Sequence, residues 1–136
     1  MPFYFNRTLA TSDMGIPYDF AQFVPDAIVC NLGTNDFSTQ PNPSKKQFEE
    51  GYLGLINQFR STYPSSIIFL VCGPLIGNPC CSNVESVAQS VAGAVYIDMQ
   101  DILSADQIAC GHPNVSGQQL MADVVAPYIA TVMNWK

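Results

Sequence analysis

The chain has 136 residues, of which 48% are hydrophobic and 12% are charged, and its formal net charge is -6. This length and composition fit one ordinary globular domain and exclude a disordered acidic segment, which would carry more charge and fewer apolar side chains. The acidic balance repels phosphate backbones and anionic lipids, and no apolar run approaches the roughly 18 residues of a membrane span. Neither nucleic acid nor a membrane is therefore an expected partner.

Three short apolar runs have the length and composition of buried strands, at residues 27–32, 67–72 and 94–98. Helical patterns separate and follow them. This alternation favours a parallel sheet with helices on its faces, that is, a three-layer α/β domain. No linker, repeat or low-complexity block interrupts the chain, so a single domain over 1–136 is the simplest organisation.

Three helices are predicted from apolar residues at spacings of three and four. The first covers 45–61, with Ser44 as its N-cap. A shorter helix after the second strand is expected to be capped by Ser82 or by the asparagine that follows it. The last covers 117–134 and contains Pro127, which should kink the helix or restart it.

The five cysteines leave at least one thiol unpaired within a monomer, because their number is odd. Cys30 and Cys72 stand in strand-like runs, where a cysteine usually acts as a small buried hydrophobe. Cys80, Cys81 and Cys110 stand in loop-like sequence and can form one disulfide, which suits a secreted protein. Zinc is disfavoured, because adjacent cysteines cannot readily both reach one tetrahedral ion and the chain has no Cys-x-x-Cys pair.

Two polar segments are candidates for chemistry. Asn35 follows the first strand in a Gly-Thr-Asn-Asp turn, and His112, the only histidine, leads into the last helix. Because the carboxyl ends of parallel strands share one edge of the sheet, both residues are expected at the same rim. The turn can be an ordinary one or can present the Asn35 amide to a developing oxyanion. His112 can be a surface histidine or a general base.

The sequence Leu-Gly-Thr-Asn-Asp at 32–36 resembles the third conserved block of the SGNH/GDSL hydrolases, and His-Pro-Asn-Val-Ser-Gly at 112–117 resembles their fifth. More narrowly, most of the chain, densest at 18–38 and 110–123, is similar to the C-terminal catalytic part of carbohydrate esterase family two, the acetyl xylan esterase type. The resemblance implies an SGNH-type three-layer fold. It also implies that His112 is the catalytic base and that Asn35 contributes to the oxyanion hole.

The same resemblance implies a serine-type esterase that removes acetyl groups from plant cell-wall polysaccharide or oligosaccharide and requires no metal or organic cofactor. It also implies secretion, although Met-Pro-Phe-Tyr at the start of the chain does not begin a signal peptide. Two features depart from the family pattern. No Gly-Asp-Ser block is present, and Ala109 occupies the usual position of the triad acid. Similar enzymes work as a Ser–His dyad with the imidazole held by a backbone carbonyl.

Loss of the nucleophile matters more than loss of the acid, because oxyanion donors alone retain only a residual acceleration. We therefore expect this chain to be the C-terminal portion of the domain and to have little activity alone. An N-terminal segment would carry the serine. If the strand and helix of that segment are missing, residues 27–32 should form an unpaired sheet edge that favours association with another chain.

Residues near the two blocks have alternative roles. Asp36 can satisfy turn amides or contact substrate, and Phe37 can pack the loop or stack on a sugar. Asp106 could orient the imidazole only if its loop folds back. Four loop serines are possible substitutes for the nucleophile, although a helix cap is the more typical role for the last: Ser12, Ser38, Ser82 and Ser116.

Two other interpretations of the whole chain stay open. A non-catalytic carbohydrate-binding module could derive from an esterase cleft and hold a glycan without cleaving it. A flavodoxin-like scaffold could match the two blocks by chance, but the chain lacks a phosphate-binding glycine loop after a strand.

Overall fold

The computed structural model describes residues 4–8 and 16–136. At its centre lies a three-stranded parallel sheet in the order β1-β2-β3, formed by Ala27–Asn31, Ile67–Cys72 and Ala94–Asp98. The second and third strands match the sequence prediction residue for residue, and the first ends one residue earlier. The parallel sheet predicted from the alternation of strand and helix is therefore confirmed.

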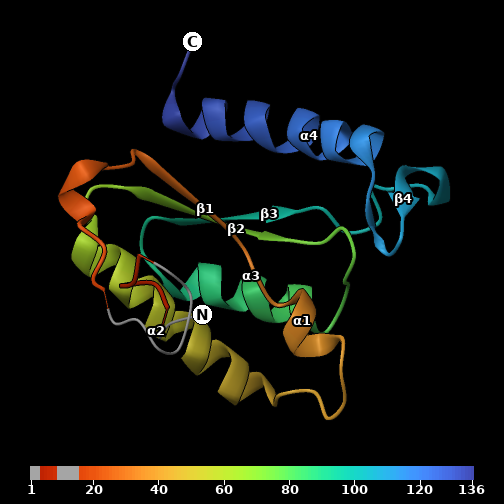
Figure 1. Cartoon of the computed structure of the whole chain (residues 1–136), viewed down its shortest axis with the longest axis horizontal. Helices are drawn as coiled ribbons and strands as arrows, with labels where there is room; N and C mark the ends of the chain where they lie inside the picture. Colours follow the sequence, from red (N-terminus) through yellow and green to blue (C-terminus); the bar gives the residue numbers. More distant parts are fainter. Residues whose placement is uncertain (1–3, 9–15) are drawn as a thin grey trace.

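Helices cover both faces of this sheet (Figure 1). The helices α2, Lys45–Thr62, and α3, Cys80–Ser90, lie on one face. The helix α4, Val115–Met133, lies on the other. The result is the predicted three-layer α/β arrangement, and no helix of the described residues is both long and apolar enough to cross a membrane.

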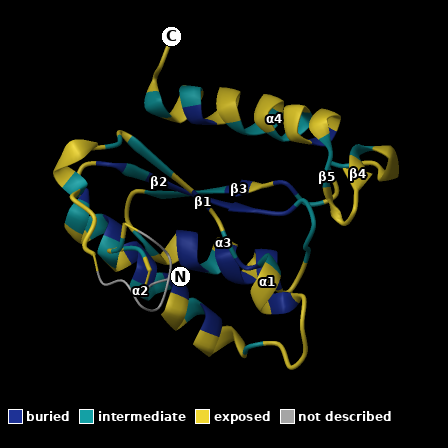
Figure 2. Cartoon of the chain, viewed as in Figure 1, coloured by how far each residue is buried: buried dark blue, intermediate teal, exposed yellow. Residues whose placement is uncertain are grey.

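The central strand β2 is buried on both of its faces, as is usual in a parallel sheet (Figure 2). Ile68 and Leu70 belong to the apolar cluster formed with α2 and α3, whereas Phe69 and Val71 belong to the cluster formed with α4. All four side chains are at most 1% exposed. This two-sided burial fixes the register of the sheet, because a shift by one residue would exchange the two clusters.

The helix α2 begins where the sequence predicts. The Ser44 hydroxyl accepts from the Gln47 backbone N–H at 3.3 Å, and the Gln47 side chain accepts from the Ser44 N–H at 3.1 Å. The helix α3 starts two residues before Ser82, so neither Ser82 nor Asn83 is its cap. The Asn78 side-chain oxygen accepts from the Ser82 N–H at 3.0 Å, which lets the helix begin earlier than its apolar pattern does.

The helix α4 also starts earlier than predicted and runs through Pro127 without restarting. Its N-cap is Asn114, whose side chain accepts from the Gly117 N–H, and Ser116 therefore does not cap it. Only Gly117 and Ile129 of α4 are buried. Most of its apolar pattern is half-buried, and Tyr128 and Val132 are exposed.

Short elements complete the described chain at its loops. They are η1, Phe20–Gln22; α1, Thr34–Phe37; η2, Ala105–Gln107; and the two-stranded hairpin of β4, Ile108–Ala109, with β5, His112–Pro113.

The edge strand β1 pairs only with β2, so the predicted unpaired edge is confirmed for the described residues. Val29 in this strand is 51% exposed, although its neighbour Cys30 is buried. One side of β1 is therefore covered by the layer that contains α2, and the other side is open to solvent.

The cysteine pairing differs from the sequence prediction. Cys72 forms a disulfide with Cys81, whereas Cys30, Cys80 and Cys110 are free. Cys80 and Cys81 lie in α3 and are buried, so they are not loop residues. The bridge forms because β2 ends beside the start of α3, with the two Cα atoms 5.2 Å apart. Cys30 is the buried small hydrophobe that was predicted.

Candidate active site

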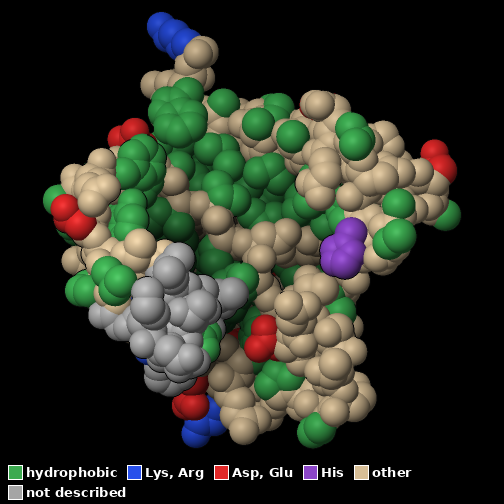
Figure 3. Space-filling model, viewed as in Figure 1, with side chains coloured by type: hydrophobic (Ala, Val, Ile, Leu, Met, Phe, Trp, Pro, Cys, Tyr) green, Lys and Arg blue, Asp and Glu red, His purple; other side chains and the backbone are tan. Residues whose placement is uncertain are grey.

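The two segments singled out in the sequence lie at the same end of the sheet. Asn35 stands in α1, directly after β1, and His112 stands in β5, after β3. Figure 1 shows α1 and the β4–β5 hairpin at the end of the sheet toward which the strands run. Both side chains are exposed, and the purple imidazole is visible at this end of the molecule in Figure 3. The sequence prediction of one shared rim is confirmed at the level of these elements.

A backbone carbonyl orients the imidazole. Nδ1 of His112 lies 3.0 Å from the carbonyl oxygen of Cys110. A carbonyl can only accept, so this hydrogen bond requires a proton on Nδ1 and leaves the lone pair of Nε2 available. Asp106 does not orient the ring: its carboxylate accepts from the Ser104 hydroxyl at 2.6 Å.

A tight hairpin turn places that carbonyl. Cys110 and Gly111, the two residues between the paired Ala109 and His112, have φ angles of 51° and 74°. Two successive positive φ values are typical of the two-residue turns that join antiparallel strands, and glycine adopts them without steric cost. The turn folds the chain back so that the Cys110 carbonyl faces the ring of His112.

Asn114 ties the histidine loop to the preceding turn and to α4. Its side-chain N–H donates to the Asp106 carbonyl at 2.7 Å, and its side-chain oxygen accepts from the Gly117 N–H at 3.0 Å. A Cβ atom on Gly117 would lie 2.5 Å from the Gln107 carbonyl oxygen, so the helix approaches this turn more closely than a larger residue allows. The signal for this role was an asparagine three positions before the predicted N-terminus of the helix, where it forms an N-cap.

The turn that carries Asn35 depends on Gly33. Its φ is +122°, and a Cβ atom there would lie 2.5 Å from Sγ of Cys80. Within the described residues the Asn35 side-chain amide makes no hydrogen bond, and the residue is exposed. The amide is therefore free to donate to a group bound at the rim. The buried thiol of Cys80 behind the turn was not predicted, because it lies 47 residues further along the chain.

Asp36 and Phe37 differ in their surroundings. Asp36 is exposed, receives no hydrogen bond from any described residue, and lines a cavity of about 190 Å³ between the turn and α2. Phe37 is 8% exposed, and its ring packs edge-on against Phe48 with 5.0 Å between centroids. Phe37 therefore packs the loop, and the expectation that it stacks on a sugar is corrected.

The candidate serines are occupied locally. The Ser38 hydroxyl donates to the Asn35 carbonyl, that of Ser82 to the Pro79 carbonyl, and that of Ser116 to the Asn114 side chain. Ser12 lies outside the described residues. No described serine donates to His112, so the described residues hold an oriented imidazole and an unbonded Asn35 amide without a serine hydrogen-bonded to the imidazole.

A three-layer α/β domain with an oriented histidine and an exposed asparagine at the carboxyl end of its parallel strands is compatible with a serine-type acyl hydrolase. Residues 5–125 match the family described as GDSL-like lipase/acylhydrolase. The chain belongs to that family.

Curated and structural relatives agree with this assignment. The chain is 32% identical, over 131 residues and 89% of its length, to the cellulase/esterase CelE of Acetivibrio thermocellus, of which it covers 16%. A family two carbohydrate esterase from Clostridium thermocellum in complex with cellohexaose superposes with a TM-score of 0.83 at 29% identity, over 90% of this chain and 40% of that one. A Corynascus thermopiles family 2 enzyme gives a TM-score of 0.86 at 23% identity, over 99% and 45%.

The relatives are carbohydrate esterases, and this chain spans less than half of each of these relatives. The SGNH-type fold expected from the two sequence blocks is confirmed.

Proposed function

We propose that this chain supplies the base and one oxyanion donor of an esterase that removes acetyl groups from polysaccharide, and that the serine comes from sequence this chain does not contain. The observation that carries the proposal is the hydrogen bond between His112 Nδ1 and the Cys110 carbonyl, at the rim that also holds Asn35. A base oriented in this way needs no neighbouring carboxylate.

In the proposed reaction the serine hydroxyl gives its proton to Nε2 of His112 while its oxygen attacks the acetyl carbon. The Asn35 amide donates to the oxyanion of the tetrahedral intermediate. The bond to the sugar oxygen then breaks, and the imidazolium returns the proton to that oxygen. Water hydrolyses the acetyl-serine with the same base. The Cys110 carbonyl keeps the ring in one orientation through both halves.

Two observations support a carbohydrate substrate. The solved relative from Clostridium thermocellum is a carbohydrate esterase bound to cellohexaose. On this chain, Asp36 presents an exposed carboxylate beside the Asn35 turn, and it accepts no hydrogen bond from residues 4–8 and 16–136. A carboxylate of this kind accepts hydrogen bonds from sugar hydroxyls, so Asp36 is the proposed substrate contact. The disulfide between Cys72 and Cys81 supports a secreted location.

The open edge of β1 is the proposed docking place for the serine-bearing segment. The Ile67 N–H donates to the Asp26 carbonyl. The Asp26 carbonyl therefore points toward β2, and so do the N–H and C=O groups of every second residue after it. The N–H and C=O groups of the residues between, Ala27, Val29 and Asn31, point away from β2 toward the open edge. A parallel strand added here would bring its carboxyl end to the rim of Asn35. Figure 3 shows hydrophobic side chains, drawn in green, gathered below α4 on the side of the molecule that faces the viewer.

The decisive experiment measures acetate release from acetylated xylan. The purified chain is assayed with and without an added N-terminal segment that carries a Gly-Asp-Ser block from a family relative. We expect acetate release only when the segment is added. His112→Ala should abolish this release, whereas Asp106→Asn should retain it, because Asp106 does not contact the imidazole of His112. Release without the segment, lost in His112→Ala, would show that this chain holds its own nucleophile.

A second function is favoured because no serine among residues 4–8 and 16–136 donates to His112. The chain could hold a glycan without cleaving it, as a non-catalytic carbohydrate-binding module. Titration with cellohexaose separates the two. Binding that His112→Ala leaves unchanged, with no acetate release in the presence of the segment, would favour the binding module.

A further inference from the structure

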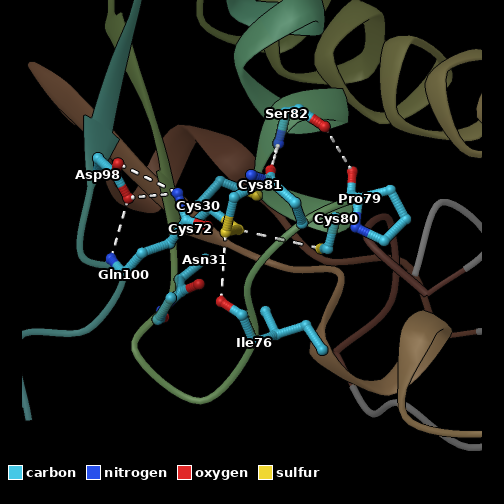
Figure 4. Close-up of a disulfide and its surroundings, with 12 residues drawn as sticks. Cys30, Asn31, Cys72, Ile76, Pro79, Cys80, Cys81, Ser82, Asp98 and Gln100 are labelled. Carbon is cyan, nitrogen blue, oxygen red and sulfur yellow. Dashed lines mark hydrogen bonds between the residues drawn. A yellow bond between two sulfur atoms is a disulfide. The ribbon is translucent and has the colours of Figure 1, made fainter.

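Three sulfur atoms pack together where β2 meets the start of α3 (Figure 4). One of them, Sγ of Cys80, lies against Gly33 in the turn that carries Asn35. Cys72 and Cys81 form the disulfide, and Sγ of Cys80 lies 3.9 Å from Sγ of Cys72. Only Cys80 retains a proton, so its S–H donates to the bridged sulfur. The three residues are at most 1% exposed. An enclosed disulfide therefore has an enclosed thiol as its immediate neighbour.

We propose that Cys80 exchanges with this bridge. The Cys80 thiolate attacks Sγ of Cys72, a Cys72–Cys80 bond forms, and the Cys72–Cys81 bond breaks. The electron pair of the broken bond leaves on the Cys81 sulfur, which takes up the proton that Cys80 gave up. One disulfide and one thiol are present before and after the step, so no oxidant or reductant is consumed.

The packing selects both the attacking thiol and the sulfur attacked. Small thiols in solvent cannot reach the bridge in the folded chain, because its sulfurs are buried. Cys80 already touches Cys72. Attack on Cys81 instead would close a ring between adjacent residues within the first turn of α3, where the helical backbone directs their side chains apart.

Exchange would alter the support of the Asn35 turn. At present Sγ of Cys80 fills the space where a Cβ atom of Gly33 would lie, only 2.5 Å away. Bond formation shortens the distance between the Cys72 and Cys80 sulfurs from 3.9 Å to about 2 Å, and we expect the Cys80 sulfur to leave its place against Gly33 in that step. The consequence for oxyanion stabilisation rests on the proposed function of Asn35. The exchange itself does not.

Charged and titratable groups from three elements face the thiol. Burial, and then the Asp36 carboxylate, raises the pKa of Cys80 to about 11. Tyr52 of α2 and Tyr96 of β3 also face it, and burial raises the pKa of both phenols. They stay neutral while Cys80 begins to ionise. The thiolate fraction should then rise about 300-fold between pH 7 and 9.5, and the exchange rate with it.

Disulfide mapping tests the exchange directly. The folded chain is incubated without reductant at pH 7 and pH 9.5, quenched in acid, and alkylated under denaturing conditions. No Lys or Arg lies between Arg60 and Lys136, so trypsin leaves all three cysteines in one peptide. Chymotryptic cleavage after Leu75 separates Cys72 from the adjacent pair, and fragment ions then locate the alkylated residue of that pair.

We expect alkylated Cys81 to accumulate with time, and faster at pH 9.5 than at pH 7. It should not accumulate in Cys80→Ser. In Cys110→Ser, which removes the exposed thiol, it should accumulate as in the native chain. A second variant, Cys81→Ser, should form the Cys72–Cys80 bridge when produced under oxidising conditions. The exchange would be overturned if Cys80 and not Cys81 stayed the alkylated residue of the adjacent pair at both pH values, and if Cys72 and Cys80 stayed unbridged in Cys81→Ser.

Amide hydrogen exchange over residues 33–37 tests whether Cys80 supports the turn that carries Asn35. Cys81→Ser, locked in the exchanged pairing, should lose protection there relative to the native chain. Unchanged protection would overturn the claim that Cys80 supports the turn, while the exchange itself would stand on the disulfide map. Neither readout depends on esterase activity, so failure of the proposed function would be recognised separately.

Discussion

Nδ1 of His112 and the carbonyl oxygen of Cys110 lie 3.0 Å apart, across a hairpin turn of two residues. Substitution of a side chain cannot remove this acceptor, because it belongs to the backbone. It orients the ring as a carboxylate would, but it carries no full negative charge to stabilise the imidazolium. The position of the base therefore depends on the loop that holds the hairpin.

That dependence leads to a prediction for Asn114. Asn114→Ala removes the cap of α4 and the hydrogen bond to the Asp106 carbonyl, so it should lower the free energy of unfolding by about 1–2 kcal/mol. Urea unfolding measures this loss, and hydrogen exchange over 108–113 should increase. Ser116→Ala is the matched control and should have a smaller effect. Equal losses in the two variants would contradict the role of Asn114.

Asn35→Ala tests the oxyanion donor. The side chain is exposed and makes no hydrogen bond with the described residues, so the substitution should leave stability unchanged. Together with the serine-bearing segment it should lower kcat roughly 10²–10³-fold, as the removal of one oxyanion-hole donor does elsewhere. The measurement is acetate release at saturating substrate. A change in KM with kcat intact would instead assign Asn35 to substrate binding.

The open β1 edge predicts self-association of the isolated chain. Val29→Lys places a charge on the uncovered side of that strand and should weaken association on the order of tenfold or more. Analytical ultracentrifugation over a range of protein concentrations measures it. Val115→Lys is the control, because Val115 is 88% exposed at the start of α4 and not in β1. A sharply melting monomer without either substitution would contradict the prediction.

Alkaline pH should destabilise the fold through Tyr96. Burial, and then the charges of Asp98 and Glu85, raises its pKa from 10.0 to about 12. The folded state thus holds this proton more tightly than the unfolded state. The stability that this provides is complete below pH 10 and is lost as pH rises toward 12. Urea unfolding at pH 9 and pH 11 should show a smaller decrease for Tyr96→Phe than for the native chain. An equal decrease in both would assign the loss to other groups.

Local sequence was sufficient for the strands and for α2. The runs that form β2 and β3 are apolar, rich in β-branched residues and bounded by turn residues. Their first and last residues can therefore be predicted from the local sequence. Ser44 and Gln47 cap α2 within four residues of chain, which is why its start could be predicted. The starts of α3 and α4 could not, because both helices begin ahead of their apolar patterns. The Asn78 side chain accepts from the Ser82 N–H in the first turn of α3, and Asn114 caps α4.

The sequence by itself also determined the shared rim, since parallel strands must end on the same edge of their sheet. Only the tertiary structure decided which acceptor orients His112, which cysteines pair and what lies behind Gly33. Each of these depends on contacts in three dimensions: a turn of positive φ, the approach of α3 to the end of β2, and a thiol placed 47 residues away. The spacing of apolar residues in the sequence predicts which face of a helix or strand is buried. Which residues contact that face is decided only when the helices pack on the sheet.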